Sequence, residues 1–114
     1  MRHRKKRKLR GDKDRRRKEL RALATALILY ERIQTTNARA KITKSFVEKI
    51  VTRGKKPGLP AIRHLRSDLP SNAVKKVLEV LSPRYQTRPG GYTRMIHSGI
   101  YKDGTKKVLL EFVK

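Results

Sequence analysis

The apolar positions in the first third of the chain repeat with the period of an α-helix. Between Asp14 and Glu31 they fall at i, i+3, i+4, i+7 and i+8, which is one stripe along a helix. The stripe consists of Leu20, Leu23, Ala24, Leu27 and Ile28. Asp14 has the side chain of a helix N-cap, so we expect this helix to begin there. The segment 32–36 that follows is short and β-branched, which favours a strand of three or four residues.

The remaining pattern predicts three more helices and two strands. A second helix is expected to be capped by Thr36 or Asn37 and to end at segment 54–58, because glycine and proline interrupt helices. Its inward side chains are expected to be Ile42, Phe46 and Ile50, flanked by Val47 and Val51. Pro60 suits the first turn of a short third helix, and Ser71 or Asn72 suits the cap of a fourth helix that Pro83 ends. Segments 93–97 and 107–113 read as strands, joined by a hairpin turn at 102–105. This order predicts an α+β fold with the helices packed on one face of a small sheet.

Charge separates the first residues from the rest of the chain. The sequence has 32 Lys and Arg against 9 Asp and Glu, a formal net charge of +23. Residues 1–18 hold 12 basic and 2 acidic residues, and Leu9 is their only large apolar side chain after Met1. Such a block buries too little surface to offset the entropy of ordering it. We therefore expect a basic arm over residues 1–13 that is disordered alone, and one globular domain over 14–114.

The composition also excludes several classes of function. Without cysteine there is no disulfide framework or thiolate metal site. The three histidines have no ligand-like spacing and the carboxylates form no close pair, so we expect no enzyme, metal, cofactor or small-molecule substrate. No apolar run approaches the roughly 18 residues of a membrane span, and the stripes are too narrow for a membrane surface. The charge favours a nucleic acid, whose phosphates it would neutralise; a nucleoid-type DNA-binding protein would share this charge.

Three segments carry the candidate RNA-binding residues. Arginine offers phosphate a planar fork and lysine a mobile point charge, which suits the basic arm, although a localisation signal or a solvated tail has the same composition. In segment 83–94 two glycines allow close approach of the backbone, while tyrosines can stack on unpaired bases; a structural turn with core tyrosines fits equally well. In segment 31–41 the helix start favours anions, although simple capping is the stronger interpretation. The candidates are Arg2, His3, Arg4, Lys5, Lys6, Arg7, Lys8, Arg10, Arg15, Arg16, Arg17, Arg21, Thr35, Thr36, Arg39, Lys41, Arg84, Arg88, Gly90, Gly91, Tyr92 and Arg94.

These segments also resemble a known family. The start MRHRK, the stretch ERIQTT at 31–36 with Ala38, Ala40 and Lys41, and the segments PRY at 83–85 and RPGGYTR at 88–94 resemble the L17 family of bacterial large-subunit ribosomal proteins. The resemblance runs in order over essentially the whole chain. The stretch 11–16, with Asp12 and Asp14, departs from the Ser-rich stretch with a His that many members carry.

The resemblance implies a fold and a role. The fold is a two-layer arrangement of helix, strand, three helices and two strands. The role is that of a structural constituent of the large (50S) subunit that is cytoplasmic, ribosome-bound and monomeric within the ribosome. Family members bind the large-subunit rRNA (23S) near the peptide exit side, adjoin other large-subunit proteins, and are not known as catalysts or cofactor binders.

Overall fold

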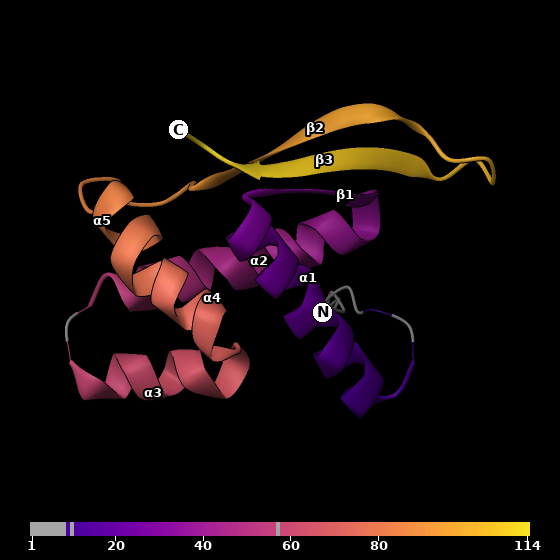
Figure 1. Cartoon of the computed structure of the whole chain (residues 1–114). Coiled ribbons are helices and arrows are strands. Elements are labelled where there is room, and N and C mark those ends of the chain that lie inside the picture. Colours follow the sequence, from indigo (N-terminus) through magenta and orange to yellow (C-terminus); the bar gives the residue numbers. More distant parts are fainter. Residues whose placement is uncertain (1–8, 10, 57) are drawn as a thin grey trace, which may run out of the picture.

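The computed structural model describes Leu9, residues 11–56 and residues 58–114. The elements are α1 (Lys13–Tyr30), β1 (Arg32–Thr36), α2 (Asn37–Gly54), α3 (Leu59–Asp68), α4 (Ser71–Lys76), the π-helical turn η1 (Val77–Leu81), α5 (Ser82–Arg84), β2 (Thr93–Ile100) and β3 (Lys106–Phe112). The strands form one antiparallel sheet in the order β1-β3-β2. The helices lie on one side of this sheet, and the β2–β3 hairpin extends past them at one end (Figure 1). The predicted α+β fold and its element order are confirmed.

Two helix starts show how local sequence sets the boundaries. Asp12, not Asp14, caps α1, because its carboxylate accepts the backbone N–H of Arg15 at 2.8 Å. Asp14 lies in the first turn, where a negative charge favours the helix dipole. The predicted cap was therefore wrong by two residues. At α2 the Thr36 hydroxyl accepts the N–H of Arg39 at 3.4 Å, which confirms Thr36 as the cap.

Pro83 does not end the fourth helix, contrary to the prediction. The chain stays helical to Arg84, because η1 widens the preceding turn and the N–H of Ser82 donates to the carbonyl of Val77, five residues back. A proline has no N–H and its ring crowds the carbonyl one turn earlier, and a π turn relieves that crowding. The predicted cap was also wrong: Pro70 holds the N-cap position of α4, and the Asn72 side chain accepts the adjacent N–H of Ala73.

The core lies between the helices and the inner face of the sheet. The predicted stripe of α1 faces it, with Ala24, Leu27 and Ile28 fully buried. The stripe of α2 is turned from the predicted one: Thr43 and Val47 are fully buried at its centre, and Phe46 is only partly buried. The sheet contributes Val108, Leu110 and Phe112, and the loop after α5 contributes Tyr85 and Tyr92. Both ends of that loop are therefore anchored in the core.

The β2–β3 hairpin is longer than the sequence suggested. β2 continues to Ile100, because the register shifts between His97 and Gly99 and this bulge absorbs one extra residue. At the turn the N–H of Tyr101 donates to the Thr105 carbonyl at 2.8 Å, and the N–H of Gly104 donates back to the Tyr101 carbonyl at 2.9 Å. The hairpin thus presents a short, well-bonded turn beyond the helical layer.

Candidate nucleic-acid interface

Most acidic side chains of the domain are engaged within the fold. Ion pairs join Glu19 to Arg39, Glu31 to Lys76 and Arg84, Asp68 to Arg53, and Glu111 to Arg94. The remaining contacts are to hydrogen-bond donors: Asp12 and Asp103 accept backbone N–H groups, and Glu48 accepts the hydroxyl of Thr93. Within the described ranges, five basic side chains pair with a carboxylate. The large excess of Lys and Arg on this part of the chain therefore faces solvent without an internal counter-charge.

Arg84, one of the predicted RNA contacts, forms an ion pair within the fold. Its guanidinium donates to Glu31, and Lys76 donates to the same carboxylate at 3.2 Å and to the Leu29 carbonyl at 3.0 Å. The Arg84 hydrogen bond, opposed by partial burial and reinforced by Lys76, lowers the pKa of Glu31 below its usual value. Glu31 itself ends α1 in the left-handed region at φ 63°. This cluster joins the end of α1 to α4 and α5 at the start of the loop.

Tyr92 closes the other end of the loop as a core residue. Its ring is only 1% exposed and lies 5.2 Å from the ring of Tyr85. Its hydroxyl lies 3.3 Å from the Thr52 hydroxyl and accepts from the Lys55 ammonium at 3.0 Å. Burial raises the pKa of Tyr92, but the hydrogen bonds from Thr52 and Lys55 outweigh it and leave the pKa below its usual value. The base-stacking interpretation of Tyr92 does not fit this burial, whereas the core interpretation does.

Between these anchors the two glycines lie on the surface. The Arg88 Nε donates to the carbonyls of both Gly90 and Gly91 at 3.1 Å, and Lys55 donates to the carbonyl of Arg88. Gly91 has φ 63°, which favours glycine. A Cβ added to Gly90 or Gly91 would meet no atom of the described chain within 4 Å. The loop thus offers an open stretch of backbone held in a defined shape, with the exposed Arg88 beside it.

The other candidates fall into three groups. Arg15, Arg17 and Lys41 are exposed, and Arg94 is 60% exposed although it pairs with Glu111 at 2.6 Å. Contacts within the fold engage the second group: Arg16 with the Asp12 carbonyl, Arg21 with the Ser67 carbonyl, Thr36 as a cap and Arg39 with Glu19, while Thr35 is buried. The third group lies outside the described residues: Arg2, His3, Arg4, Lys5, Lys6, Arg7, Lys8 and Arg10.

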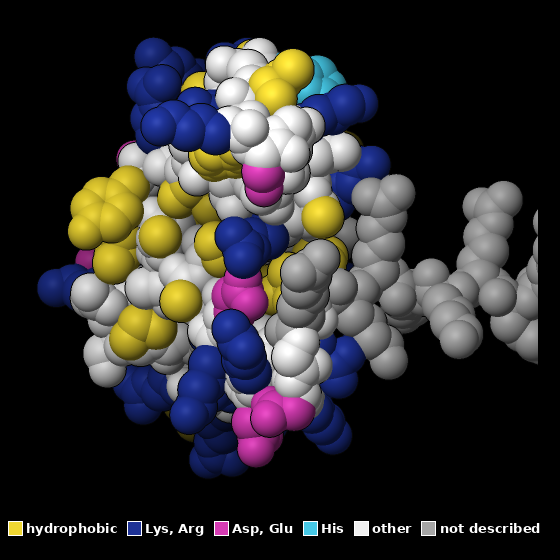
Figure 2. Space-filling view, turned by 90° about the vertical axis from the view of Figure 1, so that its right-hand side faces the viewer, with side chains coloured by type: hydrophobic (Ala, Val, Ile, Leu, Met, Phe, Trp, Pro, Cys, Tyr) yellow, Lys and Arg dark blue, Asp and Glu magenta, His cyan; other side chains and the backbone are white. Residues whose placement is uncertain are grey.

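Two features of this surface were not predicted from the sequence. The segment between the core residues Tyr85 and Tyr92 is called the 86–91 loop below. Lys55, which follows α2, donates to the Arg88 carbonyl of this loop, a contact across 33 residues that no local sequence pattern indicates. Lys102, Lys106 and Lys107 flank the hairpin turn, which was read only as a turn although its lysines were visible in the sequence. At the end of the molecule that Figure 2 faces, Lys and Arg side chains gather both at the top and towards the bottom. Basic surface therefore also exists away from the 86–91 loop.

Two further observations concern other classes of site. Among the residues that the structure describes, no three His, Asp or Glu side chains come together as metal ligands. In the same ranges, no helix is both long and apolar enough to cross a bilayer.

Comparison with known proteins gives a consistent result. Residues 19–113 match the family model described as Ribosomal protein L17. Three similar proteins carry the name Large ribosomal subunit protein bL17. The one from Thermodesulfovibrio yellowstonii is 46% identical over 82% of this chain and 72% of its own length. The one from Endomicrobium trichonymphae is 44% identical over 80% and 79%, and the one from Staphylococcus aureus is 40% identical over 94% and 98%.

Proposed function

Because this chain belongs to the ribosomal protein L17 family, and is thus a structural constituent of the large subunit of the bacterial ribosome, we propose that it acts there by binding large-subunit rRNA. The arm would follow phosphates between RNA helices. The first turn of α1 and the 86–91 loop would contact the RNA backbone. No chemical step is required of the protein.

The proposal depends on one observation: most carboxylates are engaged within the fold, while most Lys and Arg side chains of the described residues have no carboxylate partner. A domain with this imbalance is stabilised when an anionic partner neutralises its surface and counterions are released. RNA supplies such phosphates at regular spacing, and arginine and lysine are the side chains that bind them. The ion pairs of Glu31 and Glu111 also position the segments that flank the loop, which favours a preformed RNA-binding surface.

Exposure and internal contacts support a smaller set of proposed RNA contacts than the sequence alone suggested. The proposed contacts within the described domain are Arg15, Arg17, Lys41, Arg88, Gly90, Gly91 and Arg94, together with the arm. We propose that Arg84 and Tyr92 shape the loop instead of contacting RNA. Arg84 is paired with Glu31, and Tyr92 is buried in the core.

The finer placement rests on the family resemblance. We propose that the protein is cytoplasmic, that it is a monomer within the ribosome, and that it adjoins other large-subunit proteins near the peptide exit side. The RNA partner would be the 23S rRNA.

Salt-dependent RNA binding tests the proposal. The full chain is titrated against a large-subunit rRNA fragment at several salt concentrations, with duplex DNA of equal length as competitor. If on the order of ten phosphates are neutralised, log affinity should fall with log salt with a slope of about 0.7 to 0.9 per contact. A flat salt response would refute the role of the charge, and a preference for duplex DNA would favour the nucleoid-type alternative.

A further inference from the structure

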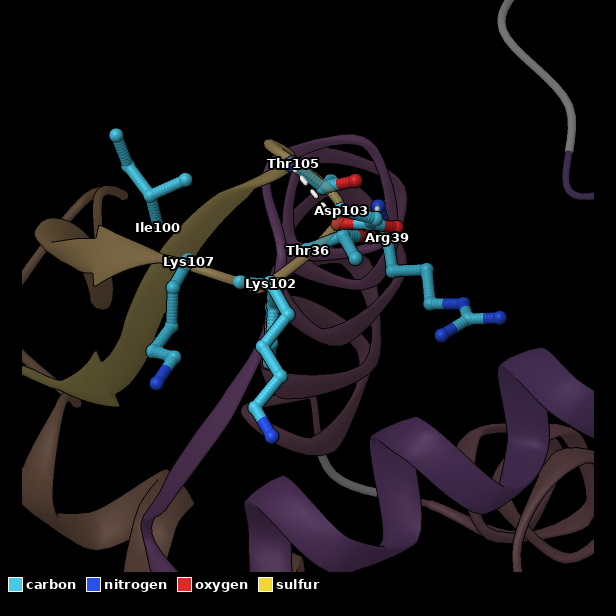
Figure 3. Close-up of a pocket in the computed structure, with 8 residues that line it drawn as sticks. Thr36, Arg39, Ile100, Lys102, Asp103, Thr105 and Lys107 are labelled. Atoms are coloured by element: carbon cyan, nitrogen blue, oxygen red, sulfur yellow. Dashed lines mark hydrogen bonds between the residues drawn. The ribbon is translucent and has the colours of Figure 1, made fainter.

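A second basic surface lies at the hairpin turn, away from the 86–91 loop. It is an open groove of about 720 Å³ where the turn approaches the start of α2 (Figure 3). The residues lining it are Thr36, Arg39, Ile100, Tyr101, Lys102, Asp103, Thr105 and Lys107. Three of these side chains are cationic and one is anionic, so the groove attracts anions.

The cations border the groove from both sides. The side chains of Lys102 and Lys107 point the same way, whereas Arg39 extends on the other side of the turn (Figure 3). The Lys107 ammonium lies 4.9 Å from the centre of the Tyr101 ring, which restrains this lysine. The Arg39 guanidinium pairs with Glu19 at 2.8 Å but remains half exposed. An anion bound along the groove could therefore contact the ammonium groups of Lys102 and Lys107 on one side of the turn and the Arg39 guanidinium on the other.

Asp103 opposes this attraction. Its carboxylate accepts the backbone N–H of Thr105 at 2.9 Å, and this hydrogen bond lowers the pKa of Asp103. The carboxylate is therefore ionised at neutral pH and serves to hold the turn. The Asp103 side chain therefore has two effects: it holds the turn through its hydrogen bond, and it repels anions through its charge. An asparagine at this position would keep the acceptor oxygen and remove the charge.

Leu9, the first residue that the structure describes, lies at this same end. An adjoining groove shares Thr36, Arg39, Asp103 and Thr105 with the first one, and Leu9 also lines it. The 86–91 loop lies at the opposite end of the hairpin (Figure 1). The eight residues of β2 separate the two surfaces by roughly 25 Å, at about 3.3 Å per residue.

We propose that this groove binds the phosphate backbone of RNA, as a second contact beside the segment that the arm follows. The inference rests on the proposed function, since it assigns a further site to the same partner. Lysines suit this task, because a mobile point charge adapts to phosphates without reading the base. The arm and the hairpin would then bind adjacent stretches of RNA backbone at one end of the domain, while the 86–91 loop contacts RNA at the other end.

Two changes of opposite sign test the groove in the full chain. The double variant Lys102→Ala and Lys107→Ala should weaken binding to a large-subunit rRNA fragment and lower the salt slope by about two, one for each lost phosphate contact. Asp103→Asn should tighten binding, because the amide oxygen still accepts the Thr105 N–H while the repulsion is gone. The matched control is Lys49→Ala with Lys75→Ala, which removes the same charge from exposed positions that do not line the groove. Melting curves verify that every variant is folded.

The outcomes separate this inference from the proposed function. If the hairpin variant behaves like the control pair, or if Asp103→Asn leaves affinity unchanged, the groove does not bind RNA even though the full chain does. If the hairpin variant binds RNA normally but no longer enters large subunits, the groove binds a protein neighbour and the inference is overturned. If the unaltered chain itself does not bind the rRNA, the proposed function fails.

Discussion

The two glycines of the 86–91 loop allow stability and RNA contact to be measured apart. Gly91 has φ 63°, so Gly91→Ala forces an L-residue into the left-handed region, which costs roughly 1 kcal/mol. No clash adds to this, because a Cβ there meets nothing of the described chain within 4 Å. For a domain of this size, about 1 kcal/mol lowers the melting temperature by about 4–8 °C. Gly90 lacks the positive φ and also has an open Cβ position, so Gly90→Ala should leave the melt unchanged.

RNA binding of the same two variants then reports on the loop alone. The full chains are titrated against a large-subunit rRNA fragment by fluorescence anisotropy, well below both melting temperatures. If the RNA backbone approaches the loop, an added methyl group obstructs it, so both variants should bind more weakly than the unaltered chain. Gly90→Ala is the cleaner probe, since nothing in the described structure predicts a loss of stability for it.

A different pattern would show that RNA does not approach the loop. If Gly90→Ala binds RNA like the unaltered chain at every salt concentration, and Gly91→Ala loses affinity only where it begins to unfold, the glycines serve the turn and not the RNA. The proposed contact at this loop would then be abandoned, whatever the arm does.

Three further predictions follow from the contacts. Deleting residues 1–10 should weaken RNA binding with little change in the melt, whereas deleting 1–13 should also cost about 1 kcal/mol, because it removes the Asp12 cap; equal melts for both deletions would contradict that cap. Gly54→Ala should destabilise the domain by about 1–3 kcal/mol in urea unfolding despite the better helix propensity of alanine, since its Cβ would lie 2.7 Å from both Ser82 and Val77; an unchanged or higher stability would show that α2 and η1 are not in such close contact. The pKa of Glu31 is lowered from 4.5, so its stabilising contribution should be present above about pH 4.5 and disappear as the pH falls through the lowered value. The free energies of unfolding of Glu31→Gln and of the unaltered chain should therefore differ at neutral pH and converge in acid. A difference that stays constant with pH would contradict the ion pairs.

Local patterns in the sequence accounted for most of the fold. The stripe of α1 and the segment 32–36 were readable because helix and strand periods repeat over neighbouring residues. The continuation of the helix through Pro83 could not be predicted in this way. It depends on the widened turn η1, which arises from packing and not from a local sequence pattern. The turned stripe of α2 has the same origin: Thr43 is buried although its hydroxyl reads as polar.

The candidate site was only partly readable, for a related reason. The two glycines and the basic residues could be located from composition. Whether Arg84 and Tyr92 face RNA or the protein depends on Glu31 and Lys55, which lie 53 and 37 residues away in the sequence. No periodic pattern connects such distant positions, so the alternatives could be stated from the sequence but not decided.

Direct contact with rRNA can be measured by ultraviolet cross-linking in cells, followed by isolation of large subunits and identification of the cross-linked peptides. We expect peptides from residues 1–18 and 84–94 to carry nucleotides of the large-subunit rRNA. Large subunits that contain the protein but yield cross-links only to proteins, or RNA cross-links confined to α3 and α4, would contradict this expectation.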